Sequence, residues 1–429
     1  MVIRMSRAPT NFFTDERAIV LRDIMGPEAD EYSAALNVLG EYSAQELWSE
    51  EKYAAINDPN NGREMDQPIS AHNGHLAFRE AMTPLITSEI GFRGAFLPEI
   101  AGGSDMPVPV YMMGLEILAQ GNGSIPLSLL IDGSVLNSVW HLGDENQRKR
   151  YVQDALENQI MTAFAQTEPG GGSAAADLDT MATVLSDGYR VLGEKNWITN
   201  ADWAGYYFLV ARTNPDRSLR GNGVSIIMVH RDEIDEIRQM RKDTVPGSYT
   251  GELIFQDAFV PLEDGGVKRM IGEKDNGFSS AKNLLNGGRV TIAAYSNGLT
   301  AEALDMAWAY AVQRESGGEK IAKKQALSFP LAELETGLDA ARLLTYRAAM
   351  RMQQGDPMRY QDASKAKLFA SELALRATEM NWRVHGSYGT SHEFRCNQLR
   401  RDVEVAVIGE GTSEVQKGII ASNRRKMYE

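Results

Sequence analysis

Apolar residues in the first 160 positions recur at the spacing of helices. In Glu16–Arg22 and Asp30–Leu39 they fall on one helical face, with charged residues between them. The same helical period marks four later stretches: Asn73–Ser88, Val110–Ala119, Leu127–Leu142 and Glu145–Glu157. The first of them contains Pro84. Turn-forming residues fill Asn57–Arg63 and predict a loop there. The pattern therefore predicts an N-terminal α-helical domain over residues 1–160.

The pattern changes at Met161, after which short apolar runs suit strands. Thr180–Val184 and Tyr189–Leu192 flank Ser186–Asp187–Gly188, and the Asp-Gly pair is a strong hairpin signal. Three more runs rich in β-branched or aromatic residues follow: Tyr206–Ala211, Val224–His230 and Glu252–Phe255. Because turn sequences and no helical pattern separate these runs, they predict an antiparallel, β-barrel-like middle domain over residues 161–275.

Long amphipathic stretches return from about Gly277. Thr300–Val312, Gln325–Gln353 and Gln361–Val384 are nearly free of glycine, and helices of this kind usually pack as an antiparallel bundle. The third predicted domain is thus a helical bundle over residues 276–429. The predicted fold class is mainly α with a central β domain.

Charge and cysteine content narrow the function classes. The 429 residues carry a net charge of −14 with a pI near 5.1, which argues against a nucleic-acid partner because phosphate binding needs a basic face. The single cysteine, Cys396, fits a reducing compartment and is more often inert packing than a reactive thiol. No apolar run approaches the roughly 18 residues of a membrane helix, and Met1–Thr10 is not followed by the apolar region of a secretory signal. We expect a cytoplasmic protein with no membrane partner.

A carboxylate between two glycines is the first candidate for chemistry. Glu410 stands between Gly409 and Gly411 in the run Ile408–Gly409–Glu410–Gly411–Thr412–Ser413–Glu414. Glycines on both sides let backbone N–H groups approach a ligand closely, so Glu410 could be a base held against a substrate. Gly-Glu-Gly is also a common turn, and the motif alone leaves both interpretations open.

Four further motifs suit a planar or anionic ligand. The glycine loop Thr167–Ser173 can present N–H groups and hydroxyls, but it does not begin a dinucleotide fold, because a β-hairpin follows where a helix and a parallel strand are needed. Trp197 could cover a ligand ring while Thr199 bonds its edge, or it could be a core tryptophan. Arg289 could hold a phosphate or cap a helix. Arg314 could do the same, or it could be a solvated surface arginine.

Motifs for metal binding and for nucleophilic catalysis are missing from the sequence. His72 and His75 have no carboxylate partners nearby. No His-Glu-x-x-His sequence, nucleophile elbow or Walker loop occurs. We predict no metal site.

In this order, the motifs resemble those of the acyl-CoA dehydrogenase family over about Gly91–Arg424. Phe164–Ser173 is similar to the family's first signature, and Gly193–Asn200 is similar to the strand that covers the flavin. Further family-like motifs are Gly287–Gly288–Arg289, Arg314 through Gln325, His385–Gly386–Ser387–Tyr388–Gly389, Arg401–Asp402 and Ile408–Glu414.

The resemblance implies a C-terminal four-helix bundle and FAD held non-covalently between the subunits of a homotetramer. It places Gln166 and Thr167 at the pyrimidine edge of the flavin, Trp197 on its ring and Thr199 on its N5 side. Other cofactor-binding residues that it implies are Phe164, Gly172, Ser173, Thr412 and Glu414, with Arg314, Ser316, Gln325, Arg383 and Gly386 at the pyrophosphate and adenine, largely across a subunit interface. The residues that it implies for substrate or CoA are Ser173, Asn286, Arg289, Gly409 and Gly411.

The resemblance also implies a reaction, the α,β-dehydrogenation of an acyl-CoA thioester to a trans-2-enoyl-CoA. Glu410 would remove the α-proton, since burial beside apolar surface raises the pKa of a glutamate toward working pH. Its backbone N–H and a flavin ribityl hydroxyl would bind the enolate oxygen, and flavin N5 would take the β-hydride. An electron-transfer flavoprotein would accept the electrons.

Several positions depart from the family's pattern. Gly409 replaces a common tyrosine, which predicts a wider pocket and a branched or ring-bearing acyl group. Some relatives place their base on the helix that here carries Gly288, which cannot serve, and this favours Glu410. Three departures affect the adenine grip: Arg383 for glutamine, Gly317 for phenylalanine and Ala174 for aspartate.

Two other functions compete with the dehydrogenase. One is an oxygen-using flavin oxidase or monooxygenase of the same fold, which Glu410 argues against because monooxygenase relatives usually lack this base. The other is a non-catalytic acyl-CoA or flavin-binding scaffold, which the intact Glu410, Thr167, Trp197 and Thr199 argue against.

Overall fold

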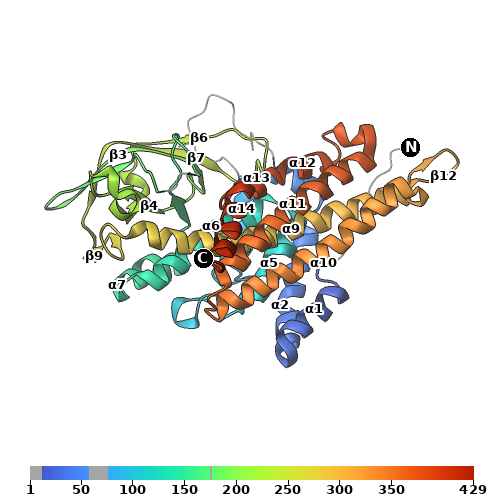
Figure 1. Ribbon diagram of the computed structural model, residues 1–429, viewed down its shortest axis with the longest axis horizontal. Helices are drawn as coiled ribbons and strands as arrows, with labels where there is room; N and C mark the ends of the chain where they lie inside the picture. The colour runs from blue at the N-terminus through green and yellow to red at the C-terminus, as the bar shows by residue number, and fades with distance from the viewer. Residues whose placement is uncertain (1–11, 58–75, 174–175) are drawn as a thin grey trace.

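The computed structural model describes residues 12–57, 76–173 and 176–429. Helices, a sheet and a second group of helices follow one another along the chain, as the hydrophobic pattern predicts (Figure 1). Most of the predicted loop Asn57–Arg63, both histidines His72 and His75, and Ala174 lie outside the described residues.

The N-terminal helices form around a buried central helix, α5. All but one of the α5 residues are buried, because α5 packs against α2, α6, α9 and α10. The helices of this part are α1 (Asp15–Met25), α2 (Ala29–Tyr42), α3 (Glu50–Ile56), α4 (Leu76–Ile86), α5 (Val108–Gly121), α6 (Ser124–Leu142), α7 (Glu145–Arg148) and α8 (Asp154–Glu157). Short 3-10 or π segments join them at Gly26–Glu28, Ser43–Leu47, Glu99–Ala101 and Lys149–Gln153.

The middle of the chain forms one sheet of eight strands in the order β10-β5-β4-β2-β3-β7-β6, with β1 also paired to β4. Most pairs are antiparallel, and the predicted hairpin is the β2–β3 pair, but β1 runs parallel to β4. The sheet strands are β1 (Thr162–Ala165), β2 (Met181–Val184), β3 (Gly188–Thr199), β4 (Tyr206–Arg212), β5 (Val224–His230), β6 (Glu236–Gln239), β7 (Thr250–Pro261) and β10 (Met270–Ile271). A separate small hairpin pairs β8 (Glu263–Asp264) with β9 (Val267–Lys268).

Strand β4 is buried on both faces, because two apolar clusters cover its alternate side chains. Tyr207 and Leu209 pack with residues of β3 and β7, while Phe208 and Val210 pack with residues of α6 and of the start of α9. This alternation is the period of a strand. Helix α9 is thereby fixed against the sheet at one end and against the N-terminal helices along its length.

The C-terminal part is built on the 35-residue helix α9, which runs from the sheet to the far end of the molecule (Figure 1). Its helices are α9 (Gly277–Ala311), α10 (Gln325–Gln353), α11 (Arg359–His385), α12 (Arg395–Asp402), α13 (Glu404–Ile408) and α14 (Ser413–Arg425). A hairpin of β11 (Glu315–Ser316) and β12 (Glu319–Lys320) turns the chain between α9 and α10 at that far end. Short 3-10 segments cover Arg217–Gly223, Arg231–Glu233, Ile321–Lys323 and Gly386–Thr390.

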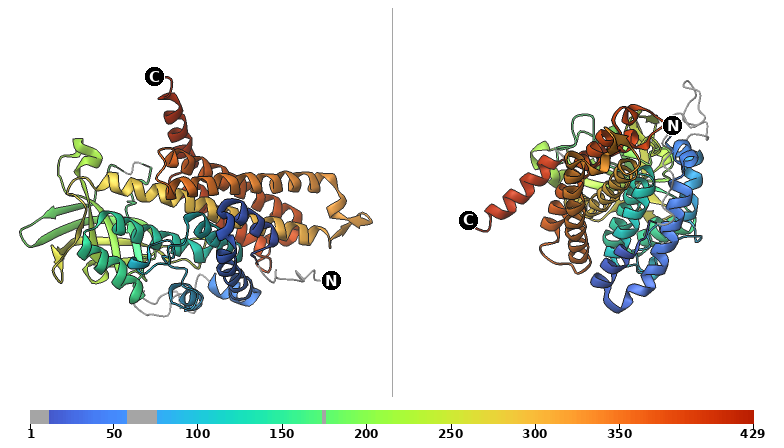
Figure 2. Two further views of the ribbon diagram at one scale, coloured as in Figure 1. Left: turned by 90° about the horizontal axis from the view of Figure 1, so that it is seen from below. Right: turned by 90° about the vertical axis from the view of Figure 1, so that its right-hand side faces the viewer.

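Helix α14 leaves the side of the bundle and carries the C-terminus away from it (Figure 2). In the described part of the chain, no helix combines the length and the apolar character needed to span a bilayer.

Buried polar contacts fix the ends of β1 and β3 on helix α6. The Asp132 carboxylate accepts a hydrogen bond from Thr162 N at 2.8 Å and pairs with Arg93 at 2.7 Å. Asn200, just after β3, donates its Nδ2 to the carbonyls of Ser128 at 3.2 Å and Thr162 at 3.1 Å. Because a buried ion pair of this kind is costly to disrupt, it gives the start of β1 a defined position, and the Asn200 hydrogen bonds join the end of β3 to it.

Candidate active site

Glu410 lies in the tight turn between helices α13 and α14. Its φ of 55° and the φ of 90° at Gly411 are both left-handed. A left-handed non-glycine residue costs on the order of 1–3 kcal/mol and persists only where its surroundings hold it. Thr412 ends the turn as the N-cap of α14, accepting a hydrogen bond from Val415 N at 3.3 Å. The turn interpretation and the base interpretation of the sequence are therefore compatible.

The Glu410 carboxylate sits over a glycine of helix α9. Its Oε2 is buried and has no hydrogen-bond partner among the described residues, and a Cβ placed on Gly288 would lie only 2.5 Å from its Cδ. Burial raises the pKa of Glu410 to about 7, while Arg289 and Lys367 lower it. A carboxylate with one buried, unpartnered oxygen and a raised pKa is suited to accept a proton.

Two side chains that the sequence analysis did not select hold the Glu410 turn. Gln416 Nε2 donates to the carbonyls of Glu410 at 3.1 Å and Gly411 at 2.9 Å. Lys367 Nζ donates to the carbonyls of Val407 at 3.1 Å and Gly411 at 2.8 Å. Lys367 could have been found in the sequence, because it interrupts the apolar face of α11, whose neighbouring positions are buried alanines.

On the sheet side, the structure brings the glycine loop and the Trp197 motif together. The backbone N–H of Asn196 donates to the Thr167 carbonyl at 2.8 Å. Beneath this contact, Lys195 forms a buried ion pair with Glu168 at 2.6 Å and donates to the Gln166 carbonyl at 3.1 Å. These bonds place the chain on either side of Thr167 against the middle of β3.

Trp197 is a surface residue and not part of the core. It sits at an irregularity of β3, between Lys195 and Ile198, where the pairing with β7 shifts register. Its φ is 60° and the residue is 57% exposed. A large aromatic held in a strained backbone conformation and turned to solvent is unusual for a fold-stabilising residue and is suited to a flat ligand. Thr199, two residues later, is half-buried.

The residues assigned to the pyrophosphate and adenine lie at the far end of the bundle. Arg314, Ser316 and Gln325 are exposed around the β11–β12 hairpin. Arg383 and Gly386, at the end of α11, are also exposed. The rings of Tyr310 and His385, tilted by 30° with centroids 4.3 Å apart, bring the ends of α9 and α11 together. Within one chain this group is not brought together with Thr167 and Trp197, because the sheet and the hairpin lie at opposite ends of the molecule (Figure 1).

Comparison with known proteins identifies the family of the chain. Three family models match: the N-terminal domain of acyl-CoA dehydrogenase over residues 70–159, its middle domain over residues 163–258 and its C-terminal domain over residues 275–424. The chain belongs to the acyl-CoA dehydrogenase family. Members of this family are flavoproteins that use FAD, and the chain is accordingly an oxidoreductase of that family.

Individual relatives cover most of the chain. A 3-(aryl)acrylate reductase of Clostridium sporogenes is 34% identical over 78% of this chain and 88% of its own length. The CarC subunit of a caffeyl-CoA reductase–Etf complex of Acetobacterium woodii is 32% identical over 78% of this chain and 87% of its own. The structure of butyryl-CoA dehydrogenase from Megasphaera elsdenii superposes with a TM-score of 0.80, at 30% identity, over 92% of this chain and 98% of that one.

The remaining family-implied residues fall into two places. Asn286 is buried on α9 and accepts a hydrogen bond from Arg289, which is half-buried. Gly409 is half-buried beside Glu410. On the sheet side, Phe164 is half-buried on β1 and packs near Phe208, while Gly172 and Ser173 are exposed; Glu414 is exposed at the start of α14.

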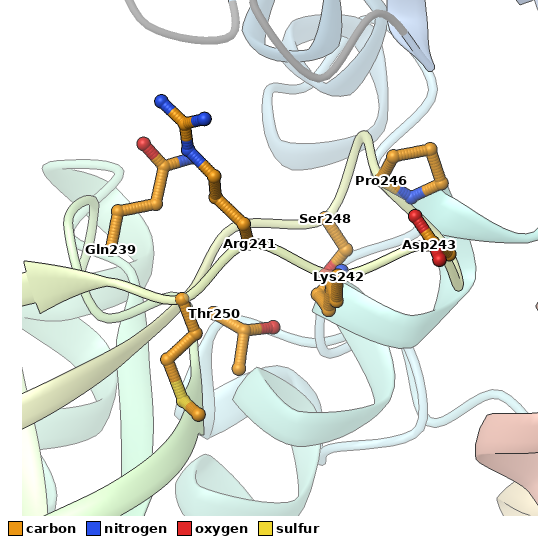
Figure 3. A pocket seen from close by; sticks show the side chains of 8 residues that line it. Gln239, Arg241, Lys242, Asp243, Pro246, Ser248 and Thr250 are labelled. Carbon is orange, nitrogen blue, oxygen red and sulfur yellow. The ribbon is translucent and has the colours of Figure 1, made fainter. Parts of the chain in front are cut away.

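A cavity of about 290 Å³ lies beside the β6–β7 turn, next to the Thr250 that pairs with Thr199 (Figure 3). None of its lining residues is predicted from the sequence to have a functional role. They are Gln239, Met240, Arg241, Lys242, Asp243, Pro246, Ser248 and Thr250.

The single cysteine lies outside this site. Cys396 is fully buried, and burial raises the pKa of its thiol to about 12, so it is packing and not a reactive thiolate. Among the described residues, no group of three or more histidine, cysteine or acidic side chains is arranged to hold a metal ion.

Proposed function

We propose that this protein catalyses the FAD-dependent α,β-dehydrogenation of an acyl-CoA thioester to a trans-2-enoyl-CoA, with Glu410 as the base that removes the α-proton. The observation that carries the proposal is the Glu410 carboxylate itself. Its Oε2 is buried and lacks a hydrogen-bond partner in the described part of the chain, and burial raises the pKa of the carboxyl to about 7. An α-proton beside a thioester is a weak acid, and its removal needs such a base in a dry, preorganised place.

The chain supplies positioning and charge for that step. Arg289 and Lys367 lower the pKa of Glu410, which keeps part of the carboxylate ionised at neutral pH. The held turn fixes the direction of the carboxylate and of the Glu410 N–H, which would donate to the thioester oxygen as negative charge develops on it. In this proposal Arg289 and Asn286 lie near the CoA moiety.

The sheet side of the site would hold the flavin of FAD. Gln166 and Thr167 would bond the pyrimidine edge, Trp197 would cover one face of the ring and Thr199 would reach its N5 side. The exposed indole at an irregular point of β3 supports this assignment. When bound, FAD supplies an acceptor for the β-hydride, which the side chains of the protein cannot supply.

We also infer that the cofactor is completed by a second subunit. The residues assigned to the pyrophosphate and adenine lie at the opposite end of the molecule from Trp197, so a partner subunit of a homotetramer would contribute them. These residues are Arg314, Ser316, Gln325, Arg383 and Gly386.

For the acyl group, we propose a branched or ring-bearing chain. Among the described residues other than its chain neighbours, a Cβ on Gly409 would meet only the carbonyl of Val405, at 3.0 Å. The open space beside Glu410 supports a pocket that accepts more bulk than a straight chain. The names of two relatives, an aryl acrylate reductase and a caffeyl-CoA reductase subunit, point in the same direction. The second name also supports an electron-transfer flavoprotein as the electron acceptor.

An anaerobic titration of the purified protein tests the proposal. Straight, branched and ring-bearing acyl-CoA thioesters are added in turn, and bleaching of the flavin absorbance is followed. We expect bleaching by at least one branched or cyclic thioester, and faster than by butyryl- or octanoyl-CoA. A yellow protein that no thioester bleaches, and whose chemically reduced form is rapidly reoxidised by air, would favour the oxygen-using flavoenzyme instead.

A further inference from the structure

Lys367 is fully buried, which is unusual for a lysine. It lies in the middle of helix α11 and is 0% exposed. A buried ammonium group is unfavourable unless it is hydrogen-bonded or paired. In the part of the chain that the structure describes, no salt bridge compensates it, and both of its hydrogen bonds go to backbone carbonyls next to Glu410.

Those two carbonyls bracket the Glu410 turn. Val407 belongs to the last turn of α13, where carbonyls have no partner within the helix, and Gly411 is the residue directly after Glu410. One ammonium group at 3.1 Å and 2.8 Å from the two oxygens joins the entry and the exit of the turn. This bridge ties the left-handed backbone at Glu410 to helix α11.

The charge of Lys367 also acts on the Glu410 carboxylate. Glu410 makes no salt bridge among the described residues, and the cations that lower its pKa are Arg289 on α9 and Lys367 on α11. Burial lowers the pKa of Lys367 itself to about 8, while Glu410, Glu372 and Glu414 raise it and Arg289 lowers it further. Lys367 is therefore mostly protonated at neutral pH.

We propose that Lys367 is a positioning residue for the base: its ammonium group ties the entry and the exit of the Glu410 turn to helix α11 and places a positive charge at that turn. This inference rests on the proposed function only for its kinetic consequence. The link between Lys367 and the ionisation of Glu410 holds whatever reaction the protein catalyses.

The first test is a direct titration of the Glu410 carboxyl. Infrared difference spectra of the purified protein are recorded against pH, and the band of Glu410 is the carboxyl band that is missing from Glu410→Gln. In Lys367→Met we expect the midpoint of this band to move up by about one pH unit, because an opposite charge in the vicinity has been removed. An unchanged midpoint overturns the proposal.

Two variants separate charge from fold. Lys365→Met removes a lysine two positions away on α11, which is partly exposed and lies 3.9 Å from Asp362, and it should leave the midpoint unchanged. If Lys367→Met does not fold, Lys367→Gln serves instead, because glutamine keeps a donor for the carbonyls and loses the charge; the upward shift is expected there too. An equal shift in Lys365→Met would show a general effect of helix charge and overturn the proposal.

Kinetics with the best thioester give the second test. In the Lys367 variants, the acid limb of the pH–rate profile of flavin reduction should move to higher pH. Gln416→Leu, which removes the other donor to the turn without changing charge, should lower the rate without moving that limb. If no thioester reduces the wild-type flavin, the proposed function fails while the infrared titration still decides the role of Lys367.

Discussion

The Glu410 carboxylate fills the space that a side chain on Gly288 would need. A Cβ on Gly288 would lie 2.5 Å from the Glu410 Cδ and 2.9 Å from its Oε1, closer than nonbonded atoms approach. Helix α9 therefore carries a glycine at the one point where the carboxylate crosses it. Since a glycine within a helix costs about 1 kcal/mol relative to alanine, the room for the carboxylate is obtained at some expense of helix stability.

Replacing Gly288 by alanine should displace the carboxylate. We expect the rate of flavin reduction to fall by about 10²-fold, the usual effect of a base misplaced by an ångström, while the protein remains folded. Stopped-flow reduction by the best thioester measures this. Gly287→Ala is the matched control, because its Cβ would meet no atom of the described residues within 4 Å. Full activity in Gly288→Ala would contradict the described packing.

The raised pKa of Glu410 predicts how stability depends on pH. The folded pKa, about 7, lies above the ordinary value of 4.5, so the folded state holds a proton that the unfolded state has released between these two pH values. Stability should therefore fall as pH rises through this window, by on the order of 3 kcal/mol. Glu410→Gln should lack this fall, and urea unfolding of both proteins at pH 5 and pH 8 compares them. Parallel pH dependence in the two proteins would be inconsistent with a buried, unpaired carboxylate.

Trp197 should affect cofactor retention more than stability. Because its indole is exposed, Trp197→Ala removes little buried surface, but it removes a stacking surface worth about 0.5–1.5 kcal/mol, or up to about tenfold in affinity. We expect a lower FAD content after dialysis and an unchanged midpoint of urea unfolding. Leu192→Ala, an exposed residue of the same strand, is the control. Equal FAD retention in all three proteins would argue against a stacking role.

The Lys195–Glu168 ion pair should be a structural support of the flavin side. Removing one partner of a buried pair leaves the other charged group uncompensated, so Lys195→Met should cost about 3–5 kcal/mol in the free energy of unfolding. The exposed pair Arg190–Asp257 on the same sheet offers a contrast, and Arg190→Met should cost less than about 1 kcal/mol. Urea unfolding distinguishes the two cases, and equal costs would be unexpected.

Much of the fold could be predicted from local pattern, and the reasons for the exceptions are physical. Gln325–Gln353 was predicted with the bounds of α10, and the Asp-Gly hairpin was predicted correctly, because both depend on nearby residues. The parallel pairing of β1 with β4 was not predicted, since it joins segments about 40 residues apart through a connection that carries no local signal.

The candidate site shows the same limit. Glu410 could be selected because its flanking glycines are visible in the sequence, whereas Lys367 and Gln416 gain their roles only when α11 and α14 pack around the turn. For Trp197 the sequence leaves a core and a ligand-facing interpretation open, because residue type alone does not fix exposure. Its position at a register shift of β3 decides between them.

The rate of anaerobic flavin reduction in Glu410→Gln is the sharpest test of Glu410 as the catalytic base. The control is Glu404→Gln, which changes an exposed carboxylate at the start of the neighbouring helix α13. If Glu410 is the base, the thioester should still bind but reduce the flavin at least about 10²–10⁴-fold more slowly, the usual contribution of a general base, while Glu404→Gln reacts like wild type. A Glu410→Gln protein whose flavin is reduced at the wild-type rate would show that Glu410 is not the base.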